Sequence, residues 1–103
     1  MSLSDGDVDP LISSRVRAGI LAFLSDAGAA DFTELGAALD LANNTLSSHL
    51  QRLEAAGYLE LRRGFLGRKP RTRVVLTASG RAAWAAHLDR LGQGSQQAPL
   101  RNQ

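Results

Sequence analysis

The residues best suited to chemistry lie between positions 43 and 56. Leu46, Leu50 and Leu53 recur there at the spacing of one apolar face of a helix. The positions between them carry short polar side chains and one long cation, groups that hydrogen-bond base edges and phosphates. We expect a helix over residues 43–56 that ends at Gly57. The side chains expected to contact DNA are Asn43, Asn44, Thr45, Ser47, Ser48, Gln51 and Arg52.

The polar side chains of this helix differ in what they can recognise. Asn44 or Gln51 can pair with two groups of adenine, and Arg52 can pair with guanine or with a phosphate. Thr45 and the two neighbouring serines suit phosphates, waters or a thymine methyl group. A simpler interpretation of the serines is that they are small residues facing solvent. We expect the N-terminal half of the helix to do most of the reading, in the major groove.

Residues 52–73 hold most of the positive charge. Seven cations stand there against two glutamates, a net charge of +5, whereas residues 1–51 sum to −5 and the chain to +2. Clustered cations attract polyanions, and we expect them to lie along the phosphates, with insertion in the minor groove as an option for one arginine. The alternative is a solvated basic hairpin without a partner. Besides Arg52 of the helix, these cations are Arg62, Arg63, Arg68, Lys69, Arg71 and Arg73, which we expect to contact DNA from the wing.

Two segments around this charge predict a pair of β-strands. Residues 58–63 alternate between apolar and polar side chains, and residues 72–77 are rich in β-branched side chains. The eight residues from 64 to 71 are too long for a two-residue turn, and their glycines and proline indicate a mobile loop. We therefore expect a basic hairpin, or wing, with a flexible tip directly after the helix.

The chain before residue 43 predicts two further helices. Asp9 suits the N-cap and Pro10 the first position of a helix that runs to about residue 26. A short strand is expected near residues 31–33, followed by a helix to about residue 39. Asp31 or Thr33 can cap that helix, and Asp31 has the spacing of a capping box with the glutamate three positions later.

A last helix is expected from Thr77, its cap, to about residue 91. Its apolar residues follow the wing, and the first helix is apolar on more than one side, which indicates two neighbours. These features favour a surface shared by two copies of the chain, although the same residues can simply belong to the core. The residues expected in the dimer contact are Leu11, Leu21, Trp84, Leu88 and Leu91.

Composition excludes several classes of site. The chain has no cysteine, which removes disulfides, thiolate metal sites and cysteine nucleophiles. No phosphate-binding loop, paired-carboxylate cluster or serine–histidine–acid arrangement stands out. The two histidines, His49 and His87, are weak grounds for a metal. We expect no enzyme, no metal and no cofactor, and we expect His49 to be either a structural side chain or a phosphate contact.

A length of 103 residues suits a single domain. Residues 1–9 carry three aspartates and no cation, so we expect a disordered acidic leader rather than a secretion signal. Residues 10–91 are expected to form the folded domain, and residues 92–103 a flexible, glycine- and glutamine-rich tail. No apolar run approaches the roughly 18 residues of a membrane span. The absence of cysteine fits a cytoplasmic setting, which we expect for this protein.

The expected order is helix, strand, helix, helix, strand, strand, helix, a mainly helical α+β winged helix-turn-helix. The run Leu-Ser-Ser-His-Leu at residues 46–50, the Ala-Gly-Tyr that follows, the basic wing and Leu-Thr-x-x-Gly at residues 76–80 carry a resemblance. Over about residues 10–91 the chain resembles small stand-alone bacterial winged-helix regulators of the MarR and ArsR types. The resemblance implies a homodimer that binds a near-palindromic operator in double-stranded DNA and usually represses.

One feature of that family is missing, and two other functions compete with this one. Metal-sensing ArsR proteins often use a cysteine pair, so thiolate metal sensing is excluded and any small-molecule effector is left open. Its pocket is expected at the helical dimer contact or beneath the first helix. The main alternative is a winged-helix protein-interaction module without DNA binding. The basic wing favours nucleic acid over a protein partner. Binding of structured RNA is a weaker third option.

Overall fold

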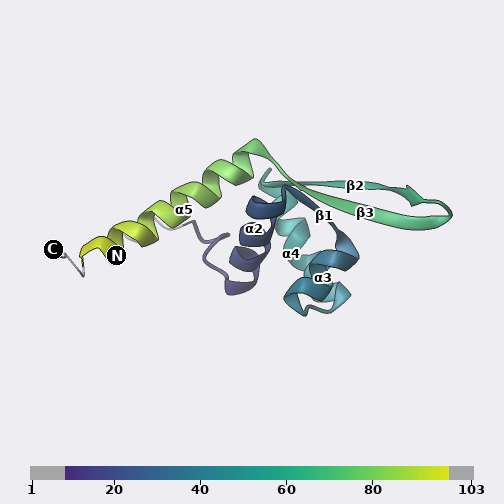
Figure 1. The fold of residues 1–103 in the computed structure, drawn as a ribbon, viewed down its shortest axis with the longest axis horizontal. Helices are drawn as coiled ribbons and strands as arrows, with labels where there is room; N and C mark the ends of the chain where they lie inside the picture. Colours follow the sequence, from purple (N-terminus) through teal and green to yellow (C-terminus); the bar gives the residue numbers. More distant parts are fainter. Residues whose placement is uncertain (1–8, 98–103) are drawn as a thin grey trace.

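The computed structural model describes residues 9–97, with side chains up to residue 92. Three helices pack beneath a small sheet, the β2–β3 hairpin projects to one side, and the last helix runs out on the other (Figure 1). The order confirms the predicted winged helix. The elements are α2 (Arg15–Ala27), β1 (Ala29–Asp31), α3 (Phe32–Leu39), α4 (Asn43–Ala55), β2 (Leu59–Leu66), β3 (Lys69–Leu76) and α5 (Ala78–Gln97).

The first helix begins later than predicted. Asp9 does act as a cap, because its Oδ1 accepts a hydrogen bond from the Leu11 N–H (3.0 Å), but it closes only a separate turn. Ser14 then adopts an extended backbone conformation, and its hydroxyl accepts from the Arg17 N–H (3.4 Å). The predicted start at Pro10 is therefore wrong, because a second capping residue interrupts the chain and α2 begins at Arg15.

The short strand precedes Phe32 instead of including it. β1 ends at Asp31, whose backbone N–H donates to Oε1 of Glu34 (3.3 Å), and α3 begins at the next residue. Of the two expected caps, Asp31 and Thr33, the structure uses Asp31. The sheet order is β1-β3-β2, and all pairs are antiparallel. A capping residue at the end of a strand thus sets both boundaries.

The wing has a tight turn, not the mobile eight-residue loop that was predicted. β2 and β3 pair without interruption as far as Leu66 and Lys69, which leaves Gly67 and Arg68 as the turn. Gly67 has φ +65°, the left-handed conformation that two-residue hairpin turns require. Pro70 is tolerated within β3 because β1 pairs with that strand only at residues 73–75. No strand on that side therefore needs a backbone N–H from residue 70.

The helix over residues 43–56 is confirmed as α4, and its three leucines are fully or almost fully buried. Gly57 follows it with φ +84°, as predicted, and the Tyr58 N–H donates to the carbonyl of Leu53 (3.0 Å). Burying one leucine side chain stabilises the fold by about 1.5–3 kcal/mol. The buried core consists of Ile12, Ile20, Leu21, Leu24, Ala30, Leu35, Leu46, Leu50, Leu53, Leu59, Val74 and Leu76.

The last helix is longer than predicted. α5 continues to Gln97, so residues 92–97 are helical instead of part of a flexible tail. Glutamine and serine tolerate a helix, and the first proline in this part of the sequence is Pro99, after the observed end. Residues 98–103 of the expected tail, and the expected leader apart from Asp9, lie outside the described residues.

The Leu-Thr-x-x-Gly segment joins three elements. Thr77 Oγ1 accepts a hydrogen bond from the Gly80 N–H (2.9 Å) and donates to the carbonyl of Gly57 (2.6 Å), so the predicted cap is confirmed. The Thr77 N–H also donates to the carbonyl of Tyr58 (3.1 Å). A β-carbon at Gly80 would lie well inside van der Waals contact with that carbonyl oxygen. The end of α4, the start of β2 and the start of α5 therefore meet at a position that only glycine fits.

We expect Gly80→Ala to lower the free energy of unfolding by about 1–3 kcal/mol, because the new methyl group would collide with backbone that cannot rotate away. Urea denaturation at neutral pH measures this change. Gly92→Ala is the matched control, because it lies in the same helix with open space at its β-carbon. We expect that variant to gain about 0.5–1 kcal/mol. Equal stability of Gly80→Ala and the wild type would contradict the close contact.

Candidate nucleic-acid interface

The polar face of α4 points away from the core. Because the three leucines turn inward, the residues between them are left at the surface. Ser47 is half-buried, and the other expected contact residues are exposed: Asn43, Asn44, Thr45, Ser48, Gln51 and Arg52. Asn44 uses its Oδ1 to accept the Thr45 N–H (2.9 Å), which leaves its amide N–H groups available. The arrangement offers solvent a row of donors and acceptors on a rigid helix.

The six cations of the wing fall into two groups. Arg62, Arg63, Arg68 and Lys69 are exposed, and only Arg62 among these four forms an ion pair with a described residue, Glu60 (3.1 Å). Both partners of that pair are well exposed, so it contributes little. Arg71 and Arg73 are half-buried and form ion pairs within the chain. The cations most available to a phosphate are thus near the tip of the wing and at Arg63.

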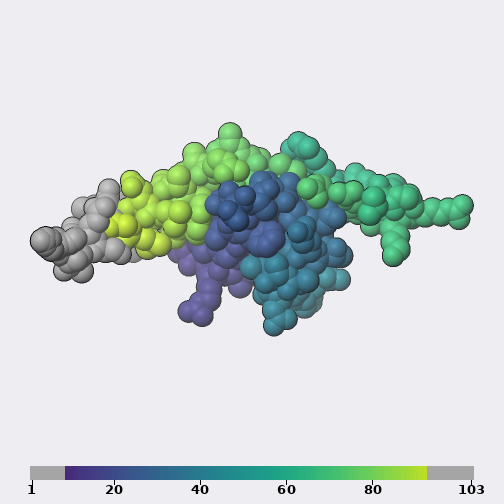
Figure 2. Space-filling view, viewed as in Figure 1, coloured from purple at the N-terminus to yellow at the C-terminus, as the bar shows by residue number. Residues whose placement is uncertain are grey.

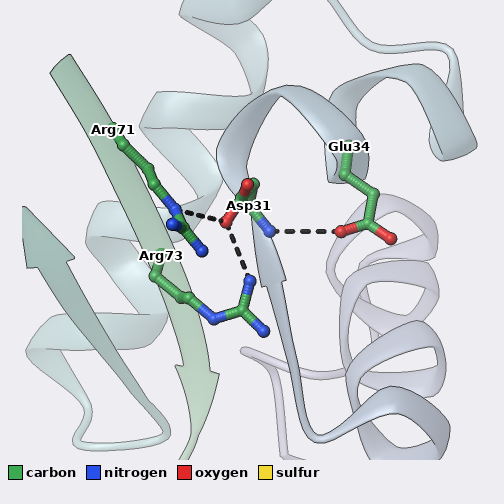
Figure 3. A network of polar contacts seen from close by, with 4 residues as sticks. All are labelled: Asp31, Glu34, Arg71 and Arg73. Atoms are coloured by element: carbon green, nitrogen blue, oxygen red, sulfur yellow. Dashed lines mark hydrogen bonds and ion pairs between the residues drawn. The ribbon is translucent and has the colours of Figure 1, made fainter. Parts of the chain in front are cut away.

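Asp31 holds the two inner arginines. Its Oδ1 accepts from Nε of Arg71 (3.1 Å) and from Nη1 of Arg73 (2.8 Å), while its backbone N–H is bound to Glu34 (Figure 3). Asp31 lies directly opposite Arg73 in the β1–β3 pairing. This contact escaped the sequence analysis, which treated Asp31 only as a cap. The spacing of the two arginines does put them on one side of a strand, but no local pattern pairs that strand with β1.

These arginines lower the pKa of Asp31. The hydrogen bond from Arg73 is the largest cause, Arg71 adds a further hydrogen bond and charge, and partial burial opposes them. The carboxylate therefore binds its proton more weakly in the folded chain than in the unfolded chain. Its contribution to stability is complete above its ordinary pKa of 3.8 and is lost as the pH falls from there through the lowered value.

A second polar contact links α2 to α4. Arg17 is buried to 9% exposure, and its Nε donates to the carbonyl of Leu11 (2.6 Å) while Nη1 lies 3.0 Å from Nδ1 of His49. Burial first, and then the charges of Arg17 and Arg52, lower the pKa of His49. A neutral imidazole can accept the arginine N–H. Of the two expected roles for His49, this geometry supports the structural one, and it explains a buried arginine that composition alone did not reveal.

The residues expected in a dimer contact are not equally accessible. Leu21 is completely buried in the core of its own chain, which removes it from that surface, and Leu11 packs partly against the same core. Trp84 is half-buried, and its ring stacks on His87 at a centroid distance of 5.3 Å. Leu88 and Leu91 are 48% and 57% exposed on α5. Of the five residues expected in the dimer contact, the two most open to a partner therefore lie on the last helix.

A cavity of about 540 Å³ separates the wing from α3 and α4. Ser47 of α4 lines it together with Arg63 and Lys69 of the wing, so α4 and the wing border one space. This is not where the sequence analysis expected a pocket, because it lies on the wing side of the helices. Within the described residues, no group of three or more His, Cys, Asp or Glu side chains could hold a metal. None of the described helices is long and apolar enough to cross a membrane.

The fold and this face define a winged helix-turn-helix with a basic wing. Residues 16–93 match the winged helix DNA-binding domain family, and the chain belongs to that family. It is 30% identical over 78 residues to the uncharacterized protein MJ0432 of Methanocaldococcus jannaschii, an alignment that covers 76% of this chain and 85% of that one. These matches confirm the resemblance to winged-helix DNA-binding regulators.

Solved structures give the same fold. The transcriptional regulator homologue protein from Pyrococcus horikoshii OT3 superposes with a TM-score of 0.87 at 28% identity, over 95% of this chain and 97% of that one. The PcaV transcriptional regulator from Streptomyces coelicolor, in complex with its natural ligand, superposes with a TM-score of 0.73 at 23% identity, over 96% and 70%. The second match supports the fold alone, whereas the first covers nearly all of both chains.

We expect Asp31→Asn to reduce stability near neutral pH and to leave it unchanged in strong acid, because the wild-type carboxylate is itself protonated there. Urea unfolding of both proteins at about pH 7 and about pH 2.5 measures the difference. Asp40→Asn is the matched control: Asp40 is exposed, forms no ion pair among the described residues and has a left-handed backbone that asparagine also adopts. The same pH dependence in both variants would contradict the role given to Asp31.

Proposed function

We propose that this protein is a sequence-specific, double-stranded DNA-binding transcriptional regulator that acts as a homodimer and represses from a near-palindromic operator in the cytoplasm. The observation that supports it most directly is the shared face of α4 and the wing. Ser47, which is half-buried on α4, lines the same cavity as Arg63 and Lys69 of the wing. A helix fits the major groove, which is about 12 Å wide, and the adjacent cations can then meet the phosphates.

The two parts of this face have different tasks. On α4, Gln51 or Asn44 is proposed to pair with adenine and Arg52 with guanine or a phosphate. The hydroxyl side chains are proposed to meet phosphates, waters or a thymine methyl group, and Asn43 the DNA backbone. On the wing, the exposed cations near the tip are proposed to supply the strongest phosphate contacts, because Arg71 and Arg73 already share Asp31. Base contacts set the choice of sequence, and phosphate contacts set affinity and its salt dependence.

A dimer supplies the contacts that one reading helix lacks. Leu88 and Leu91 are exposed on α5, which runs away from the core on the side opposite the wing (Figure 1). Exposed apolar residues repeated along such a helix favour pairing with the same helix of a second copy. Two reading helices related by a two-fold axis would then meet major grooves about 34–36 Å apart, on an inverted repeat.

The competing function is a protein-interaction module that does not bind DNA. Such a module would be expected to carry exposed apolar or acidic groups on α4 and a neutral wing. Here α4 presents polar side chains and the wing presents exposed cations, which favours nucleic acid. Competition between duplex DNA, structured RNA and heparin for the purified protein separates these functions. Equal binding to all three would leave only a general polyanion site.

A small-molecule effector is proposed on the strength of related folds. In BpsR of Bordetella bronchiseptica, a protein of similar fold, 6-hydroxynicotinic acid regulates DNA binding. In the present chain, a molecule in the cavity between wing and α4 would lie where DNA is proposed to approach. Binding of an effector there would compete with DNA directly.

We expect Arg68→Ala and Gln51→Ala to weaken DNA binding in different ways. Loss of Arg68 removes a phosphate contact, so affinity should fall for all sequences and the salt dependence should decrease by about one contact. Loss of Gln51 removes a base contact, so the gap between operator and random DNA should narrow by about 1–3 kcal/mol. Titrations at several salt concentrations, on a duplex selected from random sequence, measure both. If Gln51→Ala binds both duplexes as the wild type does, Gln51 is no reader.

We expect the wild type to sediment as a dimer at micromolar concentration and the double variant Leu88→Glu, Leu91→Glu to sediment as a monomer. Carboxylates at two exposed apolar positions would repel across the contact without disturbing the core. The monomer should remain folded but bind the full inverted repeat no better than a half-site. Phe65→Ala is the control for sedimentation alone: it removes an exposed apolar side chain from the wing and should leave the dimer intact. A monomeric wild type would contradict the proposed dimer.

A further inference from the structure

Two large apolar side chains stand exposed at the end of the wing. Phe65 is 72% exposed and Leu66 is 61% exposed, although both are at the end of β2, whose first residue, Leu59, is buried in the core. The teal-to-green wing projects beyond the helices on one side of the molecule (Figure 2). Because the two are consecutive in β2, their side chains leave opposite faces of the ribbon, so both faces of its tip carry a large exposed apolar group.

This tip is held in one shape by its backbone. Phe65 is opposite Pro70 and Leu66 is opposite Lys69, so the strands remain paired up to the two-residue turn. Gly67 takes the left-handed conformation that such a turn needs, and Pro70 restricts the backbone on the other strand. A paired ribbon loses less conformational entropy on binding than an open loop would. The apolar pair is therefore presented in a preorganised form.

The surroundings of the pair favour a polyanion. Arg68 lies in the turn between them and Lys69, and both cations are exposed. Leu66 and Lys69 also line the cavity that Ser47 of α4 borders, so the tip continues the face proposed to meet DNA. An apolar contact to protein would have to desolvate these charges, whereas phosphates on both sides of a groove would pair with them.

We infer that Phe65 and Leu66 form an apolar wedge that enters the minor groove beside the segment read by α4, opens a base step and kinks the duplex. The inference rests on the proposed function and adds to it a sequence specificity that contacts between α4 and the base edges do not give by themselves. Apolar side chains inserted between base steps unstack them and bend the DNA toward the major groove. Pyrimidine–purine steps such as TA yield most easily, so the wedge would select for a flexible step at a position no polar side chain reads.

The experiment uses the full chain and a duplex selected by the wild type, with dyes at both ends and 2-aminopurine at the step beneath the wing. Binding of the wild type should shorten the end-to-end distance of the duplex, measured by energy transfer between the dyes, and should raise the fluorescence of 2-aminopurine. Phe65→Ala and Leu66→Ala should lose most of both signals and bind about fivefold to a hundredfold more weakly, the range that stacking on a base supplies. Arg68→Ala is the matched control: it should lose affinity yet keep the bend.

A second arm changes the DNA. Replacing the flexible step by a stiff one should weaken binding by the wild type but not by Phe65→Ala, because only the wedge senses deformability. Phe65 is exposed, so its variant should melt as the wild type does, and a change in melting is checked first.

Four results would overturn the inference. Wild-type signals from Phe65→Ala and Leu66→Ala would place the tip outside the groove while leaving the proposed function intact. If Phe65→Ala and Leu66→Ala keep their DNA affinity but lose binding to anionic lipid vesicles, the tip would belong to a membrane contact. If they keep their DNA affinity but change oligomeric state, the tip would belong to a protein contact. Failure of the wild type to bind any selected duplex would end both the inference and the proposed function.

Discussion

The position of the wing relative to the helices depends on one carboxylate. Asp31 ends β1, begins α3 and binds Arg71 and Arg73 of β3 at the same time. Since β1 is only three residues long, its backbone pairing with β3 alone is a slight attachment. The ion pairs add a second attachment at the point where the sheet meets the helix-turn-helix. A wing oriented in this way places Arg63 and Lys69 around the same cavity as Ser47 of α4.

The positive charge of this chain is therefore divided between structure and recognition. Arg17 is buried against His49 and the carbonyl of Leu11, and two wing arginines are held by Asp31. The wing cations left for a polyanion are exposed and lie near the tip and at Arg63. Net charge does not distinguish these groups, because pairing depends on which strand lies beside which. Because Asp31 binds two of the wing arginines, the wing is held in place. Its exposed cations remain available to bind a polyanion.

Glycine and threonine at the junction after the wing show how a short motif acquires its residues. Thr77 caps the start of α5, and its hydroxyl donates a hydrogen bond to the carbonyl of Gly57, just after α4. Gly80 lets α5 pass close to the carbonyl of Tyr58. α5 thereby leaves the domain in a defined direction, with its apolar residues exposed beyond the core. The direction of this helix would set the distance between two reading helices in a dimer. The close packing at Gly80 would thus influence the proposed spacing of the two half-sites, because it helps to fix the direction of α5.

Local periodicity in the sequence was sufficient for the order of elements, for α4 with its buried leucines and for the caps at Asp31, Gly57 and Thr77, because helix spacing and capping act over a few residues. It was not sufficient for the tight turn at Gly67, where continuous pairing of two strands overrode the signal of a loop. Nor did it reveal that Leu21 is fully buried or that Asp31 binds two arginines. These depend on contacts between residues far apart in the chain, which only packing in three dimensions brings together.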